Sequence, residues 1–199
     1  LLSGNFLASF QHSEWEWQRR SWMSFPGQRR AEGIERVIFF CPACGTFRSV
    51  IGKGNVVLCL FCGARWPVDE YGFIGELSQQ EFAEDQNGRL ASFCENMDRI
   101  VLPGGRISER THPEGILRRF FFGPVIVERE GIRLHGEFFL FSQIRGENTF
   151  LKRVLEFTAG KRLIRIHTEK DAFLLWSILR LKKQASLIAP EASLEKAGR

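Results

Sequence analysis

The stretches Cys41-Pro-Ala-Cys44-Gly45 and Cys59-Leu-Phe-Cys62-Gly63, with fourteen residues between Cys44 and Cys59, decide the fold of the first half of this chain. Each Cys-x-x-Cys pair places two sulfurs on one tight turn, and the glycine that follows tolerates the positive φ that such turns commonly need. Two such pairs are typical of a tetrahedral zinc site built from thiolates alone. We therefore predict one zinc ion bound by Cys41, Cys44, Cys59 and Cys62.

Paired cysteines also occur as disulfides, redox dithiols and iron-sulfur ligands. A redox dithiol needs a single motif at a helix N-terminus, whereas here two copies flank a hairpin-like stretch, Phe47 to Leu58. Its tip, Gly52-Lys53-Gly54-Asn55, lacks the remaining pattern of a phosphate-binding loop. Residues 36–75 are therefore interpreted as a zinc ribbon. Four thiolates leave no position for water or substrate, so the zinc is expected to be structural.

The composition is that of an ordinary globular chain. Its 199 residues are 44% hydrophobic and 26% charged, enough for one medium domain or two small ones. No apolar run approaches the length of a membrane span, and thiol ligands favour a reducing compartment, so we expect a cytoplasmic protein, peripheral to the inner face of the membrane at most. Cys94 is expected to be buried and inert. The first residue is not Met, which suggests a fragment or a processed chain.

Residues 1–35 are predicted to be an N-terminal segment that is helical around Ser13 to Arg20. Strands are expected at Arg36 to Phe40, entering the ribbon, and at Ala64 to Phe73, leaving it. Residues 76–115 are predicted to form a helical connector that starts at the capping box Ser78-Gln-Gln-Glu81. Gly88 is expected to interrupt its helix, and Pro103-Gly104-Gly105 to make a turn at its end.

From residue 116 to 185 the periodicity is that of short, hairpin-spaced strands, predicted at 123–130, 131–135, 136–141, 144–147, 153–157 and 162–167. A helix then opens at Thr168-Glu-Lys-Asp171 and carries Phe173, Trp176 and Leu179 on its inner face. Residues 186–199 are expected to be a tail. The fold class is therefore mainly β (α+β): a zinc ribbon plus a small antiparallel sheet or open barrel closed by a C-terminal helix.

The segment from Gly123 to Lys183 resembles a pleckstrin-homology-like (PH-like) or GRAM-like domain. The resemblance rests on Gly131-Ile-Arg-Leu134, Ile144-Arg-Gly146, Val154-Leu-Glu-Phe157, Leu163-Ile-Arg-Ile166 and Trp176. It covers about a third of the chain, so upstream strands, at 36–40 or 99–102, are expected to complete the barrel. A zinc ribbon combined with such a module resembles the C-terminal accessory region of some bacterial lysophospholipid acyltransferases, which acylate 1-acyl-glycerol 3-phosphate.

Those acyltransferases carry a catalytic His and Asp with four residues between them. None of His12, His112, His135 and His167 has an Asp at that separation. His167 and Asp171 have three residues between them and are interpreted as part of a helix cap. The resemblance therefore implies a non-catalytic accessory or regulatory region of a phospholipid-synthesising enzyme, and no residue is assigned a catalytic role.

The formal net charge is +5, and residues 112–183 contain 14 Lys/Arg against 8 Asp/Glu. This excess permits an anionic partner, although solvated strand and helix surfaces would look much the same. We expect anionic lipid headgroups, or a membrane enzyme domain, to bind a basic cluster made of Lys152, Arg153, Lys161, Arg162 and Arg165.

Two other functions stay open at this point. Zinc ribbons also serve nucleic-acid machinery, and Arg48, Lys53 and Arg65 would then contact phosphates. The apolar ribbon hairpin suits packing against protein better, so nucleic acid is the less favoured partner. A protein-protein adaptor would use the Phe-rich segments 120–122 and 138–139 if they were exposed, whereas we expect them to be buried.

Overall fold

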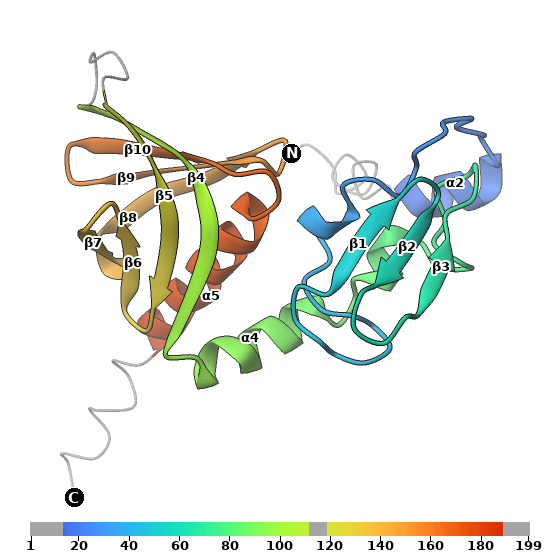
Figure 1. Ribbon diagram of the computed structural model, residues 1–199, viewed down its shortest axis with the longest axis horizontal. Coiled ribbons are helices and arrows are strands. Elements are labelled where there is room, and N and C mark those ends of the chain that lie inside the picture. Colours follow the sequence, from blue (N-terminus) through green and yellow to red (C-terminus); the bar gives the residue numbers. More distant parts are fainter. Residues whose placement is uncertain (1–13, 112–118, 189–199) are drawn as a thin grey trace, which may run out of the picture. The chain divides into compact units, whose positions relative to one another are not determined.

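The computed structural model describes residues 14–111 and 119–188, which form two compact units (Figure 1). The first unit contains Cys41–Glu84 together with the residues up to Ile34. The second contains Glu35–Phe40 together with the residues from Asp85 onward. Both carry an antiparallel sheet, so the described chain is mainly β with a few helices, as predicted. The predicted tail lies outside the described residues, except that positions 186–188 continue the last helix.

The first unit is built on a sheet with the strand order β1-β2-β3. Its elements are α2 (Glu14–Ser21), β1 (Val50–Lys53), β2 (Val56–Cys59), β3 (Arg65–Pro67) and α3 (Gln79–Phe82). Gly54 has φ 60° and opens the two-residue turn between β1 and β2. At Gly52 an added Cβ would lie 1.8 Å from the Ala31 carbonyl oxygen. Glycine at position 52 is therefore required by a close backbone approach rather than by the turn.

Two strands expected beside the ribbon differ in the structure. In the segment predicted to enter it as a strand, 36–40, Arg36 belongs to the 3₁₀ helix η1 (Ile34–Arg36) and residues 37–40 form no strand. The strand predicted over 64–73 is limited to β3. The apolar residues that suggested these strands are buried without a ladder: Phe39 and Phe40 are 3% and 4% exposed. Burial alone produced a strand-like pattern here.

Aromatic contacts and a helix cap hold the rest of the first unit. The rings of Trp15 and Phe73 lie 5.7 Å apart. The capping box is confirmed, because the Glu81 N–H donates to Ser78 Oγ at 3.2 Å and the Ser78 N–H donates to Glu81 Oε2 at 2.8 Å. Arg19 Nη2 also donates to Glu81 Oε2, at 2.6 Å. The bonds from Arg19 and Ser78 lower the pKa of Glu81 to about 2.

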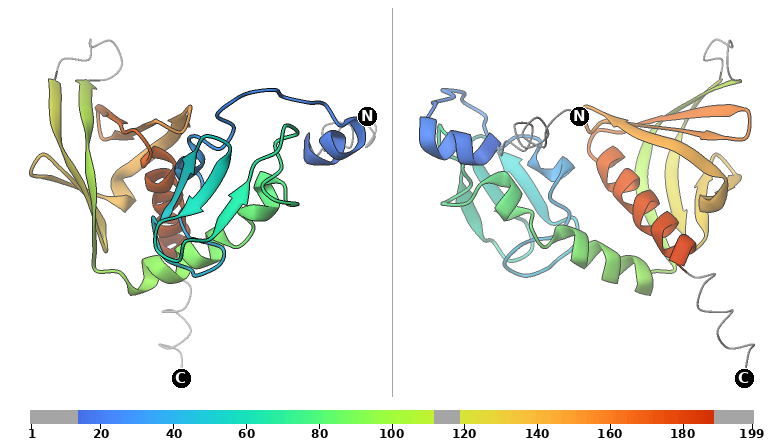
Figure 2. Two further views of the ribbon diagram at one scale, coloured as in Figure 1. Left: turned by 45° about the vertical axis from the view of Figure 1, so that its right-hand side comes forward. Right: turned by 180° about the vertical axis from the view of Figure 1, so that it is seen from behind.

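The second unit is a sheet with the strand order β7-β6-β5-β4-β10-β9-β8. Its strands are β4 (Arg99–Thr111), β5 (Arg119–Glu128), β6 (Gly131–Leu134), β7 (Glu137–Leu140), β8 (Ile144–Phe150), β9 (Val154–Ala159) and β10 (Arg162–His167). Its helices are α4 (Gln86–Asn96), the 3₁₀ helix η2 (Phe141–Gln143) and α5 (Ala172–Ile188). Two meanders, β4 to β7 and β8 to β10, are thus joined where β4 pairs with β10. The helix α5 lies along the curled sheet (Figure 2).

The predicted turn at Pro103-Gly104-Gly105 is wrong. These residues lie inside β4, where the pairing with β5 shifts register between Leu102 and Gly105. A β-bulge accommodates proline and glycine inside a strand, which explains the misreading. The long strand β4 therefore occupies residues 99–111 of the range 76–115, for which we expected a helical connector. Gly88 does not interrupt a helix either, since the break falls at residues 83–85 and α4 runs through Gly88.

The closing helix α5 buries a face that is rotated from the predicted one. Thr168 Oγ1 accepts from the Asp171 N–H at 2.9 Å, which confirms the capping signal. Leu179 is buried as expected, but its buried neighbours on the helix are Leu174, Leu175 and Ile178, each 1% exposed or less. Phe173 and Trp176 are half-buried at the margin of this face. The main core of the second unit therefore lies between these aliphatic side chains and the sheet.

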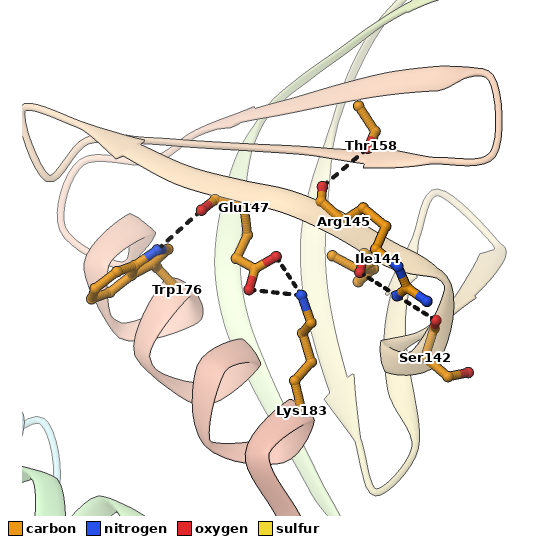
Figure 3. Close-up of polar contacts among 7 residues, drawn as sticks. All are labelled: Ser142, Ile144, Arg145, Glu147, Thr158, Trp176 and Lys183. Atoms are coloured by element: carbon orange, nitrogen blue, oxygen red, sulfur yellow. Dashed lines mark hydrogen bonds and ion pairs between the residues drawn. The ribbon is translucent and has the colours of Figure 1, made fainter. Parts of the chain in front are cut away.

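Glu147 on β8 ties α5 to the sheet (Figure 3). Its carboxylate accepts from Lys183 Nζ at 2.8 and 2.6 Å, and its carbonyl oxygen accepts from Trp176 Nε1 at 3.4 Å. The pairing of β8 with β9 shifts register between Arg145 and Asn148. A bulge re-aims the side chains beside it, so this irregularity accounts for a charged residue on β8 facing the helix.

Gln86, at the start of α4, holds the segment 35–40 in the second unit. Its Oε1 accepts from the N–H groups of Phe39 and Phe40 at 2.8 Å each, and its Nε2 donates to the Phe40 carbonyl at 3.0 Å. The Gln86 side chain is 5% exposed, so these bonds satisfy backbone groups that water does not reach. The Gln86 amide thus supplies the backbone hydrogen bonds that a neighbouring strand would otherwise supply to this segment.

Candidate functional site

The two Cys-x-x-Cys pairs form two turns of matching geometry. The Gly45 N–H donates to the Cys41 carbonyl at 2.8 Å, and the Gly63 N–H donates to the Cys59 carbonyl at 3.0 Å. Both glycines have positive φ, 71° and 74°, as their positions predicted. In each pair the first cysteine is buried and the second is exposed. The site therefore lies at the surface of the first unit, with one side closed by protein.

The four sulfurs converge on one point. Their Sγ atoms all lie within 4.8 Å of one another, and the Cys41–Cys62 and Cys44–Cys59 pairs are each separated by 3.8 Å. A tetrahedral zinc site with Zn–S bonds of about 2.3 Å requires sulfurs about 3.8 Å apart. The donor set thus fits zinc in number, chemistry and spacing. A disulfide would need S–S contact near 2.05 Å, and all five cysteines are free.

The local environment shifts the pKa values of the Cys41 and Cys59 thiols in opposite directions. Burial raises the pKa of Cys41 to about 12. Burial also opposes ionisation of Cys59, but hydrogen bonds from the Cys62 and Phe61 backbone and from Ser49 outweigh it and lower the pKa of Cys59 to about 6. These shifts favour ionisation of Cys59 over ionisation of Cys41, and a bound cation would lower the pKa of Cys41.

Two hydroxyl groups beside the sulfurs were not predicted from the sequence. Ser49 Oγ lies 3.3 Å from Cys59 Sγ, and Thr46 Oγ1 lies 3.2 Å from Cys44 Sγ. Such neighbours orient thiolate ligands and tune their charge. Both follow the first Cys-x-x-Cys pair by a few positions, but only the hairpin geometry brings Ser49 to the second pair. A bound zinc would be held by four thiolates with no open position, which suits stabilisation of the fold.

The predicted basic cluster is divided between two ends of β9. Lys152 and Arg153 lie in the turn between β8 and β9, whereas Lys161 lies in the turn between β9 and β10. The six residues of β9 separate these turns, and at about 3.3 Å per residue that is roughly 20 Å. All three side chains are exposed. Lys152, Arg153 and Lys161 are close in sequence, but β9 separates the two turns in space.

The other two members of the predicted cluster are engaged with carboxylates. Arg162 Nε donates to Glu109 at 2.6 Å, and its Nη1 lies 2.7 Å from Glu137. Arg165 Nε donates to Glu156 at 2.8 Å. Pairing compensates much of their charge, so Arg162 and Arg165 offer less attraction to an anionic surface than exposed lysines and arginines do.

The residues considered for the alternative functions are also placed by the structure. Lys53 and Arg65 are exposed, and Arg48 is half-buried with φ 55°. Among the Phe-rich segments, Phe139 is 6% exposed, as expected, but Phe138 is 37% exposed and Phe122 is 78% exposed. The Phe120 side chain lies outside the described part. Cys94 is buried at 3% exposure, and burial raises the pKa of its thiol.

His167 gives a pH-dependent test of the outer face of the sheet. Burial, together with the positive charges of Arg106 and Arg165, lowers the pKa of His167. We expect NMR titration to place it below the ordinary value of about 6.5, and the Arg106→Gln variant to raise it. Because the folded pKa is depressed, the neutral ring adds stability above about pH 6.5 that is lost as pH falls through the folded value. A midpoint at or above 6.5, or no response to Arg106→Gln, contradicts this placement.

No helix within residues 14–111 and 119–188 combines the length and apolar character needed to cross a bilayer. A scan against protein-family models, a search of curated proteins and a search of solved structures each found no match to this chain.

Proposed function

We propose that this chain is a zinc-stabilised, non-catalytic accessory module that docks on anionic phospholipid surfaces, as the lipid-facing region of an enzyme that acylates lysophospholipids. The observation that carries the proposal is the topology of the second unit. Two antiparallel meanders of four and three strands are joined through their first and last strands and closed by a terminal helix. This arrangement supports the resemblance to PH-like or GRAM-like domains, and with it the lipid-facing role that the resemblance implies.

The metal site supports an accessory role rather than a catalytic one. Four thiolates complete a tetrahedron, so a zinc ion held there would have no position for water, substrate or a leaving group. Its contribution would be to the folding free energy of the first unit.

The exposed basic side chains support an anionic partner. Lys152 and Arg153 stand next to each other in one exposed turn. A Lys or Arg near an anionic bilayer contributes about 1 kcal/mol, so two of them favour docking without making it irreversible. Such weak attraction suits a region whose enzyme meets its lipid substrate at the same surface.

Co-sedimentation of the zinc-loaded chain with vesicles tests the proposal. We expect pelleting with vesicles that contain phosphatidylglycerol, little pelleting with phosphatidylcholine alone, and weaker binding as salt increases. Duplex and single-stranded nucleic acids at low and high salt form the parallel arm. Equal pelleting with both vesicle types, or salt-sensitive nucleic-acid binding without lipid preference, would overturn the proposal.

A further inference from the structure

The turn between β8 and β9 combines an exposed apolar tip with two cations. The Arg153 N–H donates to the Phe150 carbonyl at 3.0 Å, which closes a four-residue turn. Its two central residues, Leu151 and Lys152, have φ values of 50° and 55°. Positive φ at both central positions defines the type I′ hairpin turn.

Leu151 and Lys152 are unfavourable residues for the positive φ values of this turn. Type I′ turns strongly prefer Asn-Gly or related pairs, because a side chain with a bulky Cβ substituent is strained at positive φ. The turn between β6 and β7 of the same sheet follows this preference at its second position, with Gly136 at φ 84° after His135 at φ 46°. Folding of the hairpin therefore does not account for leucine at position 151.

The turn exposes both apolar and basic side chains. Leu151 is 91% exposed and Phe150 is 44% exposed, while Lys152 and Arg153 are exposed beside them. Lys152 Nζ lies 5.3 Å from the ring centre of Phe173, at the start of α5. The turn thus projects an apolar residue beyond a base that carries two positive charges.

An anionic bilayer is the surface that complements this arrangement. Its phosphate groups attract Lys and Arg, and the boundary just below them accepts apolar side chains, which peripheral proteins bury there by about 5–10 Å. A groove on a protein partner would also bury leucine, but a convex tip with cations on its flank matches a flat, charged, deformable surface better.

We propose that the β8–β9 turn is the membrane-inserting element of this chain: Leu151, with Phe150 behind it, enters the acyl boundary of an anionic bilayer while Lys152 and Arg153 pair with phosphate groups. The inference rests on the proposed lipid docking and names the element responsible. Lys161 then lies in a different turn from the contact, while Arg162 and Arg165 pair with carboxylates of the sheet.

The decisive variant is Leu151→Asn. Asn accepts positive φ better than Leu, so the variant is expected to melt at the same temperature as the wild type or higher. Because the bilayer would bury the Leu151 side chain, its loss is expected to weaken binding to phosphatidylglycerol vesicles by about 30-fold. The Leu151→Trp variant is expected to bind at least as tightly as the wild type, because Trp prefers the bilayer interface.

The cations and the specificity of the tip are tested separately. Replacing Lys152 and Arg153 together by Gln is expected to weaken binding to the anionic vesicles by about 30-fold and to leave the weak binding to neutral vesicles unchanged. Leu60→Asn is the matched control, since Leu60 is also an exposed leucine, at 64%, but lies in the first unit. It is expected to bind like the wild type.

The outcomes separate the inference from the proposed function. If the wild type pellets with anionic vesicles and Leu151→Asn pellets equally well, the insertion is overturned and lipid docking stands. Equal weakening by Leu151→Asn and Leu60→Asn also overturns it, because any exposed leucine would then suffice. If the wild type binds no vesicle, the proposed function and the insertion both fall.

Discussion

Removal of zinc is expected to unfold the first unit while leaving the second unit folded. Structural zinc contributes roughly 10 kcal/mol or more in small zinc modules, which exceeds the total stability of most small domains. The short strands β1, β2 and β3 hold few buried residues that could replace this contribution. Cys59→Ser should have the same effect as a chelator, since Cys59 is one of the four candidate ligands and is fully buried.

The measurement is zinc content together with hydrogen exchange resolved along the sequence. Cys59→Ser or chelator should abolish protection in β1 and β2 and retain it in β9 and β10. Cys94→Ser is the matched control, because Cys94 is a buried cysteine on α4 remote in sequence from the other four. Full protection of β1 and β2 without zinc would show that the site is dispensable for the fold.

Phe157→Ala is expected to destabilise the second unit by about 3–5 kcal/mol. Phe157 is fully buried on β9, and its ring meets that of Phe139, 6.1 Å away, across the sheet interior. Truncation removes apolar contacts and leaves a cavity that strands on both sides prevent from collapsing. Denaturant unfolding followed by circular dichroism should show the change in the transition of this unit.

Phe122→Ala provides the matched control for that loss. The two residues are chemically identical and both lie in strands of one sheet, but Phe122 is 78% exposed. Its truncation is expected to change the free energy of unfolding by less than about 0.5 kcal/mol. Similar losses from both substitutions would mean that the described burial of Phe157 is not what stabilises the unit.

Features encoded over short stretches could be predicted from the sequence. The cysteine spacing indicated a convergent thiol cluster because each pair forms its own turn, closed by a hydrogen bond between residues four positions apart. The capping box at Ser78 and the capping signal at Thr168 were correct for the same reason. Alternation in Ile132 and Leu134 identified the buried face of β6. In each case the information lies within one or two turns of backbone.

Features that depend on distant pairing could not be predicted in this way. The bulge between Leu102 and Gly105 lies where β4 pairs with β5, which the local Pro-Gly-Gly sequence does not indicate, so it looked like a turn. The burial of Phe39 and Phe40 depends on Gln86, more than forty positions later. Proximity in sequence likewise grouped Lys152 with Lys161, although a full strand separates them.

The ribbon is inserted between Phe40 and Asp85, and the bonds from Gln86 to Phe39 and Phe40 hold the chain before the ribbon next to the chain after it. During synthesis the segment 35–40 leaves the ribosome before the ribbon but cannot join its own unit until Gln86 has emerged. A ribbon that has already folded shortens the loop that must then close, whereas an unfolded one adds its full length to the entropic cost. The availability of zinc to the nascent chain would therefore influence how fast the downstream sheet assembles.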